Sequence, residues 1–151
     1  AGVVVGLGGV AAHVLCKLPR DAEGYMGRLR CVQEISAVTA ACMMVKTSVF
    51  KAVGGFDEEL KVAFNDIDLC MKVRKYGVKI VFTPYAELYH YESKSRGMED
   101  TPEKQLRFSR EVNCFRRKWE RELLKGDPYY NPNLTLNNTD CSLRKQEKNG
   151  D

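Results

Sequence analysis

The sequence has no long apolar run, no Cys-x-x-Cys pair and no internal repeat. A helix that crosses a bilayer needs roughly 18 or more consecutive apolar residues, so we expect no membrane-spanning helix. The six cysteines are scattered, and without paired spacing they predict reduced thiols in the cytoplasm rather than a disulfide framework. A basic signal peptide and an initiating Met are also absent, and the chain starts inside the apolar run Gly2 to Leu7. This start predicts a piece excised from a longer protein.

The composition that remains is ordinary for a soluble protein. A length of 151 residues fits one domain with a real core, and 44% of the residues are hydrophobic while 29% are charged. The net charge of +4 comes mostly from an Arg/Lys-rich segment late in the chain. Such a charge suits an anionic ligand or surface without requiring one.

A glycine turn follows the first apolar run. The pattern Gly6-x-Gly8 resembles the start of a dinucleotide-binding fingerprint, but no third glycine stands at the required position. No crossover helix with an acidic strand end follows either. The run therefore predicts a buried strand that enters a turn, without a nucleotide site.

Two carboxylates, Asp66 and Asp68, open an amphipathic segment that predicts a helix over residues 65–76. If Asn65 is the N-cap, Asp68 falls at the third helical position and can complete a capping box. Alternatively, one carboxylate is a general base at the rim of a pocket. Residues two apart on a helix point roughly 200° away from each other, so both cannot face one ligand. We expect one to work and the other to cap.

Apolar patterns and turn residues predict the other elements. These are a strand-like run of small residues at 35–45, a short helix capped by Thr47 or Ser48 and stopped by Gly54-Gly55, a strand at 78–82, and extended chain at 86–92. A long helix at 102–125 has Thr101 as its cap, Pro102 at its first position and Gly126 past its end. Its apolar stripe is predicted to face the core, and comprises Phe108, Val112, Phe115, Trp119 and Leu123.

Two features leave alternatives open. His90 stands before a polar loop and is a candidate metal ligand or proton carrier, or a hydrogen-bonded structural histidine. The arginines of the 102–125 helix form a solvated basic face, or a nucleic-acid-binding surface that no recognition motif supports.

An ordered series of motifs runs over about ninety residues, from Ser36 to Tyr130. The series consists of Val38-Thr39-Ala40-Ala41-Cys42-Met43-Met44-Val45, Phe50 through Gly54-Gly55-Phe56-Asp57, Phe64-Asn65-Asp66-Ile67-Asp68-Leu69-Cys70, Tyr76-Gly77, Thr83-Pro84, Tyr89-His90-Tyr91-Glu92-Ser93, Ser95-Arg96-Gly97 and Asp127-Pro128-Tyr129-Tyr130-Asn131-Pro132. Together they resemble the C-terminal half of inverting family-two glycosyltransferases of the GT-A fold, closest to rhamnosyltransferase-like and O-antigen-type bacterial members.

The resemblance implies a fold, a reaction and roles for particular residues. The fold is α/β, a partial GT-A (nucleotide-diphospho-sugar transferase) fold with a mixed sheet flanked by helices and a long C-terminal helix. Residues 1–126 would be the acceptor-side part of the transferase domain, and 127–151 an extended, partly disordered tail. Asp66 matches the general base, since the family's acidic doublet reads Asn65-Asp66 here. Asn65, Asp68 and Thr39 would bind or support the acceptor, Arg96 would reach the donor diphosphate, and His90 would complete a metal shell.

The resemblance also implies partners. These are a nucleotide-sugar donor, a glycan or lipid-linked acceptor, and the missing N-terminal half of the same domain. The resemblance implies no nucleic-acid partner, and it allows peripheral association with the membrane. A divalent cation, Mn²⁺ or Mg²⁺, is expected in the full-length enzyme and none on this chain alone, because the family's Asp-x-Asp loop precedes the part present. The expected location is the cytoplasm or the inner face of the membrane.

That missing half is a large departure from the family pattern, so we expect the chain to be inactive alone. Two other classes of function stay open. One is a noncatalytic carbohydrate-binding or regulatory module on a transferase-like scaffold, and the other is a basic nucleic-acid-binding domain.

Overall fold

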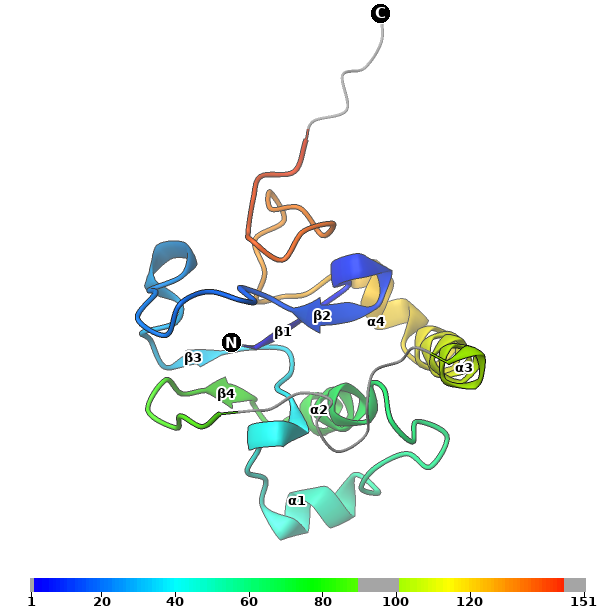
Figure 1. Cartoon of the computed structure of the whole chain (residues 1–151). Helices are drawn as coiled ribbons and strands as arrows, with labels where there is room; N and C mark the ends of the chain where they lie inside the picture. The colour runs from blue at the N-terminus through cyan, green and yellow to red at the C-terminus, as the bar shows by residue number, and fades with distance from the viewer. Residues whose placement is uncertain (1, 90–100, 146–151) are drawn as a thin grey trace, which may run out of the picture.

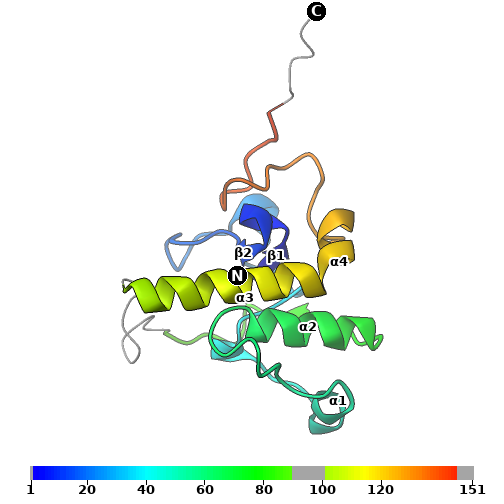
Figure 2. The same ribbon diagram turned by 90° about the vertical axis from the view of Figure 1, so that its right-hand side faces the viewer.

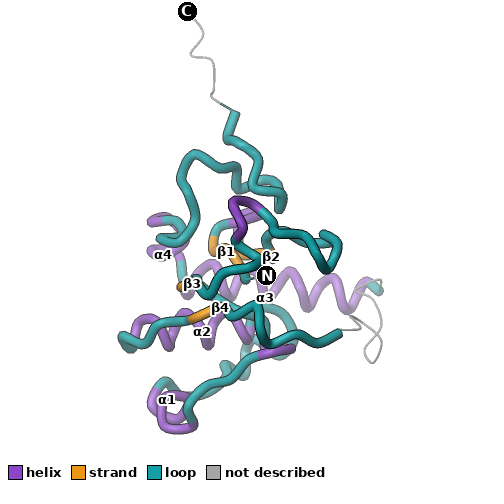
Figure 3. The backbone as a smooth tube through the Cα atoms, turned by 90° about the vertical axis from the view of Figure 1, so that its left-hand side faces the viewer, coloured by secondary structure: helices purple, strands orange, loops and turns teal. Residues whose placement is uncertain are grey.

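The computed structural model describes residues 2–89 and 101–145, and shows a mixed α/β arrangement of short strands and helices (Figure 1). The elements, in chain order, are β1 (Val3–Val5), β2 (Ala11–His13), β3 (Gln33–Glu34), α1 (Thr47–Ala52), α2 (Asn65–Lys75), β4 (Val81–Phe82), α3 (Pro102–Lys118) and α4 (Glu120–Lys125). Three 3₁₀ turns lie between them, η1 (Leu7–Gly9), η2 (Tyr25–Gly27) and η3 (Ala40–Cys42). Figure 3 shows that loops make up much of the backbone. His90 and Arg96 lie outside the described residues.

The predicted first strand is present as β1, and the glycine turn after it closes a hairpin. β2 pairs with β1 in antiparallel register, with Val4 opposite Ala12. Gly6 and Gly8 have φ values of 95° and 64°, in the left-handed region that glycine reaches without strain. A strand that turns straight back has no crossover helix, which confirms that Gly6-x-Gly8 is not a dinucleotide fingerprint.

The other predicted strands are shorter than expected. β3 pairs antiparallel with β4, and Val3 bridges to Ala37, so extended chain between residues 33 and 37 lies beside both β1 and β4. The run predicted as a strand at 35–45 leaves the sheet after this bridge and enters η3. The prediction was wrong there because no described strand pairs with the chain beyond Ala37, and Ala40, Ala41 and Cys42 are exposed in the turn. The strand predicted at 78–82 keeps only its last two residues, and the described part of 86–92 contains no strand.

Helices α2 and α3 lie side by side and run in the same direction (Figure 2). The cluster of buried side chains between them and β1 is the main core, and contains Val3, Val5, Val10, Ala37, Leu60, Ile67, Cys70, Met71, Phe115 and Trp119. The predicted stripe is confirmed at Phe115 and Trp119, whereas Phe108 is exposed. The helix predicted at 102–125 is interrupted at Trp119, whose φ of −114° ends α3 and begins α4. Thr101, Pro102 and Gly126 occupy the predicted terminal positions.

The segment from Asp127 onward, expected as an extended tail, packs against the β1–β2 hairpin. The backbone N–H of Val5 donates to Asp127 Oδ2 at 2.8 Å, and the N–H of Gly8 donates to the carbonyl of Leu136 at 2.8 Å. A second buried cluster forms here from Val4, Leu7, Val14, Tyr130, Leu134 and Cys141. Aromatic and aliphatic side chains spaced within a polar loop gave no periodic signal, so this packing was not predicted.

Two predicted helix caps differ from the structure. α1 begins at Thr47 itself, after Lys46, and no side chain caps it. α2 begins at Asn65, because the preceding Phe64 takes a left-handed conformation with φ of 63°. Asn65 is thus the first helical residue rather than the N-cap, and Asp68 lies too far inside the helix to close a capping box.

Candidate functional site

Asp66 lies in the first turn of α2 and contacts the η3 turn. Its Oδ2 accepts a hydrogen bond from the backbone N–H of Ala40 at 3.0 Å, and its Oδ1 accepts from the N–H of Ile67 at 2.9 Å. The Asn65 side chain accepts from the N–H of Asp66 at 2.7 Å. Asp66 is half-buried, and a carboxylate offers about four acceptor positions, so both oxygens keep room for a further donor. The geometry suits a carboxylate held in place at a surface.

Asp68 has the opposite environment and is completely buried, at 0% exposure. Trp119 donates its indole N–H to Asp68 Oδ1 at 2.8 Å, and Lys118 Nζ lies 2.8 Å from the same oxygen. Lys72 Nζ lies 3.1 Å from Oδ2. A buried carboxylate with two cations and an indole around it is a structural group that ties α2 to α3, so Asp68 cannot face a ligand.

The Lys118 ammonium joins Asp68 to a second carboxylate, Asp57, in the loop between α1 and α2. Burial lowers the pKa of Lys118, but its hydrogen bonds to Asp57 and Asp68 outweigh this effect and raise the pKa overall. The same ammonium, followed by the N–H of Glu59, lowers the pKa of Asp57. Lys72 donates to the carbonyl of Gly55 in the same loop. These contacts connect the loop to both helices.

The chain just before α2 is held by Glu111 of α3. This carboxylate is 3% exposed, and its Oε1 accepts from the N–H of Val62 at 3.1 Å while Oε2 accepts from the N–H of Ala63 at 2.8 Å. Phe64 follows and packs its ring 5.3 Å from that of Phe115. The pair of hydrogen bonds and this ring contact fix the turn that orients the first residues of α2. Sequence reasoning missed Glu111, because an isolated acidic residue on an amphipathic helix gives no signal of burial.

The predicted site residues separate into three groups, of which the third, His90 and Arg96, lies outside the described residues. Asp66, Asn65 and Thr39 come together, since Thr39 caps η3 by accepting from the N–H of Ala41, next to the amide that Asp66 holds. Asp68 is turned away from them toward α3. Cys70 is buried near Asp66, and burial raises the pKa of its thiol to about 11, which argues against a nucleophilic role at neutral pH.

No metal-binding cluster of three His, Cys, Asp or Glu side chains occurs in residues 2–89 and 101–145. Asp68 is engaged by Lys72, Lys118 and Trp119, which leaves Asp66 as the one carboxylate of the pair that could reach an ion. One carboxylate does not hold Mg²⁺ or Mn²⁺, which prefer several oxygen ligands. The described residues therefore do not provide a metal site.

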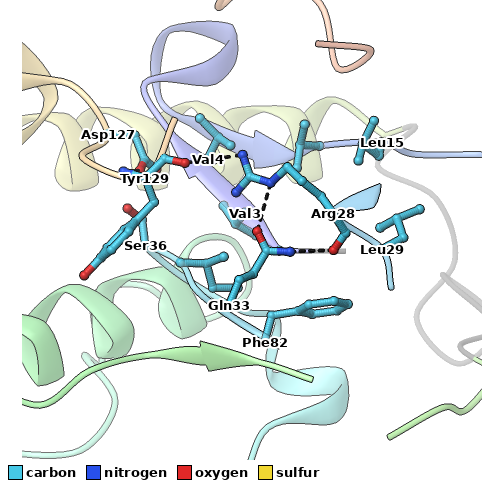
Figure 4. Close-up of a pocket in the computed structure, with 13 residues that line it drawn as sticks. Val3, Val4, Leu15, Arg28, Leu29, Gln33, Ser36, Phe82, Asp127 and Tyr129 are labelled. Atoms are coloured by element: carbon cyan, nitrogen blue, oxygen red, sulfur yellow. Dashed lines mark hydrogen bonds between the residues drawn. The ribbon is translucent and has the colours of Figure 1, made fainter. Parts of the chain in front are cut away.

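A small cavity lies beside β1, and Figure 4 shows the residues that line it. Arg28 crosses it, with Nε donating to Gln33 Oε1 at 2.9 Å and Nη1 donating to the carbonyl of Tyr129 at 3.3 Å. Ser36 lines the same cavity and its buried hydroxyl has no hydrogen-bond partner among the described residues. The volume, about 20 Å³, suits one water molecule and is too small for a sugar. Asp66 lies outside it, at the surface beside η3.

The same part of the described chain contains no helix long and apolar enough to cross a membrane. Each of its six cysteines is a free thiol.

Comparison with known proteins places the chain among bacterial sequences. It is 57% identical over 144 residues to the uncharacterized protein y4gI of Sinorhizobium fredii (strain NBRC 101917 / NGR234), a match that covers 95% of this chain and 16% of that protein. It is 38% identical over 152 residues to the O-antigen biosynthesis protein RfbC of Myxococcus xanthus, covering 100% of this chain and 12% of that protein.

A shorter match joins the chain to a transferase. Over 62 residues it is 36% identical to the N-acetylglucosaminyl-diphospho-decaprenol L-rhamnosyltransferase of Mycobacterium tuberculosis, covering 41% of this chain and 20% of that enzyme. No protein-family model and no solved structure matches. The chain spans 12–20% of the length of these relatives. It is therefore related to part of bacterial O-antigen biosynthesis and rhamnosyltransferase proteins.

Proposed function

We propose that the chain is the acceptor-side part of an inverting glycosyltransferase of the GT-A fold. The enzyme would move a sugar from a nucleotide-diphosphate donor to a hydroxyl of a glycan or lipid-linked acceptor, in the synthesis of bacterial surface polysaccharide. The relationship to RfbC and to the rhamnosyltransferase supports this class of reaction. The mixed α/β architecture is compatible with it.

The observation that carries the proposal is the contrast between the two carboxylates of α2. Asp68 is fully buried, and its carboxylate is paired with lysines and accepts a hydrogen bond from Trp119. Asp66 is half-buried at the start of the helix, and its carboxylate accepts hydrogen bonds from the amides of Ala40 and Ile67. A general base must be held in place and must still reach the proton that it removes. Of these two, only Asp66 meets both conditions.

In the proposed mechanism the Asp66 carboxylate accepts the proton of the acceptor hydroxyl. The hydroxyl oxygen forms a bond to the anomeric carbon from the face opposite the leaving group, and the bond from that carbon to the nucleotide diphosphate breaks. The configuration at this carbon is therefore inverted. Thr39 and Asn65, which lie around Asp66, would orient the acceptor.

The donor side of the reaction needs residues beyond those described. We propose that it comes from a preceding half of the same domain, with Arg96 against the diphosphate. A divalent cation, Mn²⁺ or Mg²⁺, would in the longer enzyme stabilise the charge of the leaving diphosphate, with His90 among its ligands. We expect the chain without this half to be inactive and to bind no such cation tightly.

The first test is Asp66→Asn in the longer protein. Turnover should fall at least about a hundredfold, the low end for the loss of general-base catalysis, while donor binding stays unchanged and the fold stays intact. The unfolding midpoint should fall only slightly, because the new side-chain amide loses one of two acceptors at a half-buried position where water can replace it. Sugar transfer from the nucleotide donor measures the first, and donor titration and urea unfolding measure the others. The matched variant is Asp68→Asn, which we expect to destabilise the fold because it disturbs a buried ion pair.

The opposite pattern would contradict the proposal. If Asp68→Asn abolishes transfer in a folded protein while Asp66→Asn transfers normally, the base is not Asp66. If both variants and the unaltered protein bind glycans without transfer, the noncatalytic carbohydrate-binding module is the better description.

A further inference from the structure

A larger cavity lies at the far end of α2 from Asp66. It is a groove of about 510 Å³ between the C-terminal ends of α2 and α4, which Figure 2 shows at the same end of the molecule. Volumes of about 300–1,000 Å³ are typical of sites for small molecules. Lys75 lines the groove and follows Asp66 on α2 by nine residues, over which a helix rises about 14 Å. A small molecule in the groove therefore does not reach Asp66.

Cations from both helices line the groove. They are Arg74 and Lys75 of α2, Lys125 of α4, and Lys79 from the chain after α2. Lys79 pairs with Glu34, but no carboxylate within residues 2–89 and 101–145 forms an ion pair with the other three. Three cations that have no acidic partner in the described chain are thus gathered at one cavity.

Two of these cations lie against aromatic rings that also line the groove. The guanidinium carbon of Arg74 lies 5.4 Å from the centre of the Tyr129 ring, and Lys75 Nζ lies 5.9 Å from that of Trp119. A ring face attracts a cation without neutralising its charge. The two cations are therefore positioned before a ligand arrives, which lowers the cost of ordering them when it binds.

Helix dipoles account for only part of this charge. Lys75 and Lys125 stand in the last turns of α2 and α4, where a cation offsets the free carbonyls. Each helix end carries about half a negative charge, so the two ends and Glu122, the acid of the lining, offset about two of the three unpaired cations. The groove keeps an excess of positive charge that an anionic ligand would balance.

The rest of the lining indicates what the anion is attached to. Apolar side chains form much of the wall, with Val78, Pro128 and Tyr129 among them, and a bare phosphate ion would leave this wall in water. Glu122 is half-buried and forms no ion pair in the part of the chain that the structure describes. Its carboxylate repels a second anionic group but accepts hydrogen bonds from hydroxyls. A phosphate, several hydroxyls and an apolar C–H face occur together in a phosphorylated sugar.

We propose that the groove between the ends of α2 and α4 binds a sugar phosphate. Arg74, Lys75 and Lys125 contact the phosphate, because guanidinium and ammonium groups donate charge-assisted hydrogen bonds to this anion. Glu122 accepts hydrogen bonds from the sugar hydroxyls, and the C–H face lies against the apolar wall. This inference goes beyond the proposed transfer reaction and does not depend on Asp66, because it concerns the opposite end of α2.

Titration of the 151-residue chain with glucose 6-phosphate tests the proposal without donor or acceptor. In NMR spectra the amide signals of Gly77 and Gly126, which line the groove, should shift as the ligand is added. Glucose 6-phosphate should bind at least about tenfold more tightly than inorganic phosphate, the gain expected from one hydrogen bond to a charged acceptor. Glucose at the same concentrations should produce no shift, because it lacks the anion.

Variants of the lining separate its charges. Lys75→Ala with Lys125→Ala should weaken binding of glucose 6-phosphate at least about tenfold, since two charged donors are lost. The matched control, Lys46→Ala with Lys51→Ala, removes the same charge from exposed positions at the α1 end and should change binding less than about threefold.

Glu122→Ala tests the contact with the hydroxyls. It should strengthen binding of inorganic phosphate, because a repelling charge is gone. The preference for glucose 6-phosphate over inorganic phosphate should fall at least about threefold, because the sugar loses its acceptor. An unchanged preference would show that no hydroxyl contacts Glu122 and would overturn the proposed binding mode.

Other results would overturn the proposal as a whole. Equal loss from the two lysine pairs, or no shift at Gly77 and Gly126, would show that binding follows net charge or lies elsewhere. Equal affinity for inorganic phosphate and glucose 6-phosphate would mean that the groove does not recognise a sugar. Tighter binding of uridine diphosphate at these signals would assign the groove to a nucleotide. Asp66→Asn should leave every titration unchanged, so failure of this proposal is visible separately from failure of the proposed transfer.

Discussion

Asp66 and Asp68 show how two like residues, two positions apart, obtain different roles. An α-helix turns about 100° per residue, so their side chains leave α2 in nearly opposite directions. Asp66 points to the η3 turn and accepts a hydrogen bond from the amide of Ala40. Asp68 points to α3 and contacts Trp119 and Lys118. The phase of the helix thus gives one carboxylate to the candidate site and the other to the core.

The Trp119–Asp68 hydrogen bond can be tested by Trp119→Phe. The substitution keeps an aromatic ring but removes the indole N–H from a buried, charged acceptor. Hydrogen bonds to charged groups contribute about 1.5–3 kcal/mol, so the free energy of unfolding should fall by about that amount, plus a cost for the smaller ring. Urea unfolding measures it, and a double-mutant cycle with Asp68→Asn separates the hydrogen bond from the loss of volume.

Tyr129→Phe is the matched control for this variant. It removes a hydroxyl that donates to Glu34 at 3.2 Å at a partly exposed position. The expected loss is below about 1 kcal/mol because water replaces the donor. A coupling of less than about 0.5 kcal/mol between Trp119 and Asp68 would show that their contact does not hold the two helices together.

At the scale of elements, α3 determines how the chain enters α2. Glu111 holds the amides of Val62 and Ala63, 49 and 48 residues earlier in the sequence. Phe64 then reverses into the left-handed region that starts the helix. A non-glycine residue with positive φ carries strain, and the neighbouring contacts must outweigh it. The Glu111 hydrogen bonds and the Phe64–Phe115 packing are the contacts available for this.

Glu111→Gln should loosen this turn. The side chain keeps its size, but an NH₂ group replaces one oxygen and faces a backbone N–H that then has no acceptor. The free energy of unfolding should fall by about 1–3 kcal/mol, the cost of a buried unsatisfied donor. The amides of Val62 and Ala63 should exchange with solvent at least about tenfold faster, which hydrogen exchange followed by NMR measures. Glu103→Gln, in the exposed first turn of α3, should leave the exchange of these two amides unaltered, and unaltered exchange in Glu111→Gln would refute the role.

Local signals were sufficient for some elements and failed where long-range contacts decide. Thr101, Pro102 and Gly126 mark the ends of the last helical region correctly because capping is a local effect. The break at Trp119 was not predicted, since its indole bonds to a carboxylate 51 residues away. The strand at 35–45 failed for a similar reason, because the sheet offers it a partner only as far as Ala37.

The candidate site was predicted in the same uneven way. The motif around Asn65-Asp66 included the residues that meet η3. Spacing on the helix indicated that Asp66 and Asp68 would face different ways, whereas the resemblance placed Asp68 with the acceptor. Spacing could not show that Asp68 is fully buried, because Lys118 and Trp119, which contact it from α3 and its end, are distant in the sequence, and only Lys72 is a local partner. Glu111 had no sequence signal, since its partners are backbone amides that any residue carries.

At the scale of the whole molecule, one chain of charges links the parts around the candidate site. It runs from Asp57, in the loop after α1, through Lys118 of α3 to Asp68 of α2 and on to Lys72. Because Lys72 also donates to the carbonyl of Gly55, the path returns to the loop where it began. A change in the charge of one member should therefore be felt as a change in the stability of the whole fold.

Acid should weaken this network at Asp57. Its pKa is lowered by the hydrogen bond from Lys118, then by the N–H of Glu59, and the charge of Lys72 adds to the effect. The unfolded chain has the ordinary value of about 3.9 and so binds more protons at acidic pH than the folded chain does. The stabilisation is therefore present above about pH 4 and is lost as the pH falls through the lower folded value.

Urea unfolding tests this at about pH 7 and about pH 3. Between these two pH values the unaltered chain should lose more free energy of unfolding than Asp57→Asn, which has no such proton to take up. In a Lys118→Met background the difference should become smaller, because the largest of the three effects that lower the pKa of Asp57 is gone while those of Glu59 and Lys72 remain. If the unaltered chain and Asp57→Asn lose the same free energy on acidification, the Asp57–Lys118 pair does not link the stability of the fold to pH.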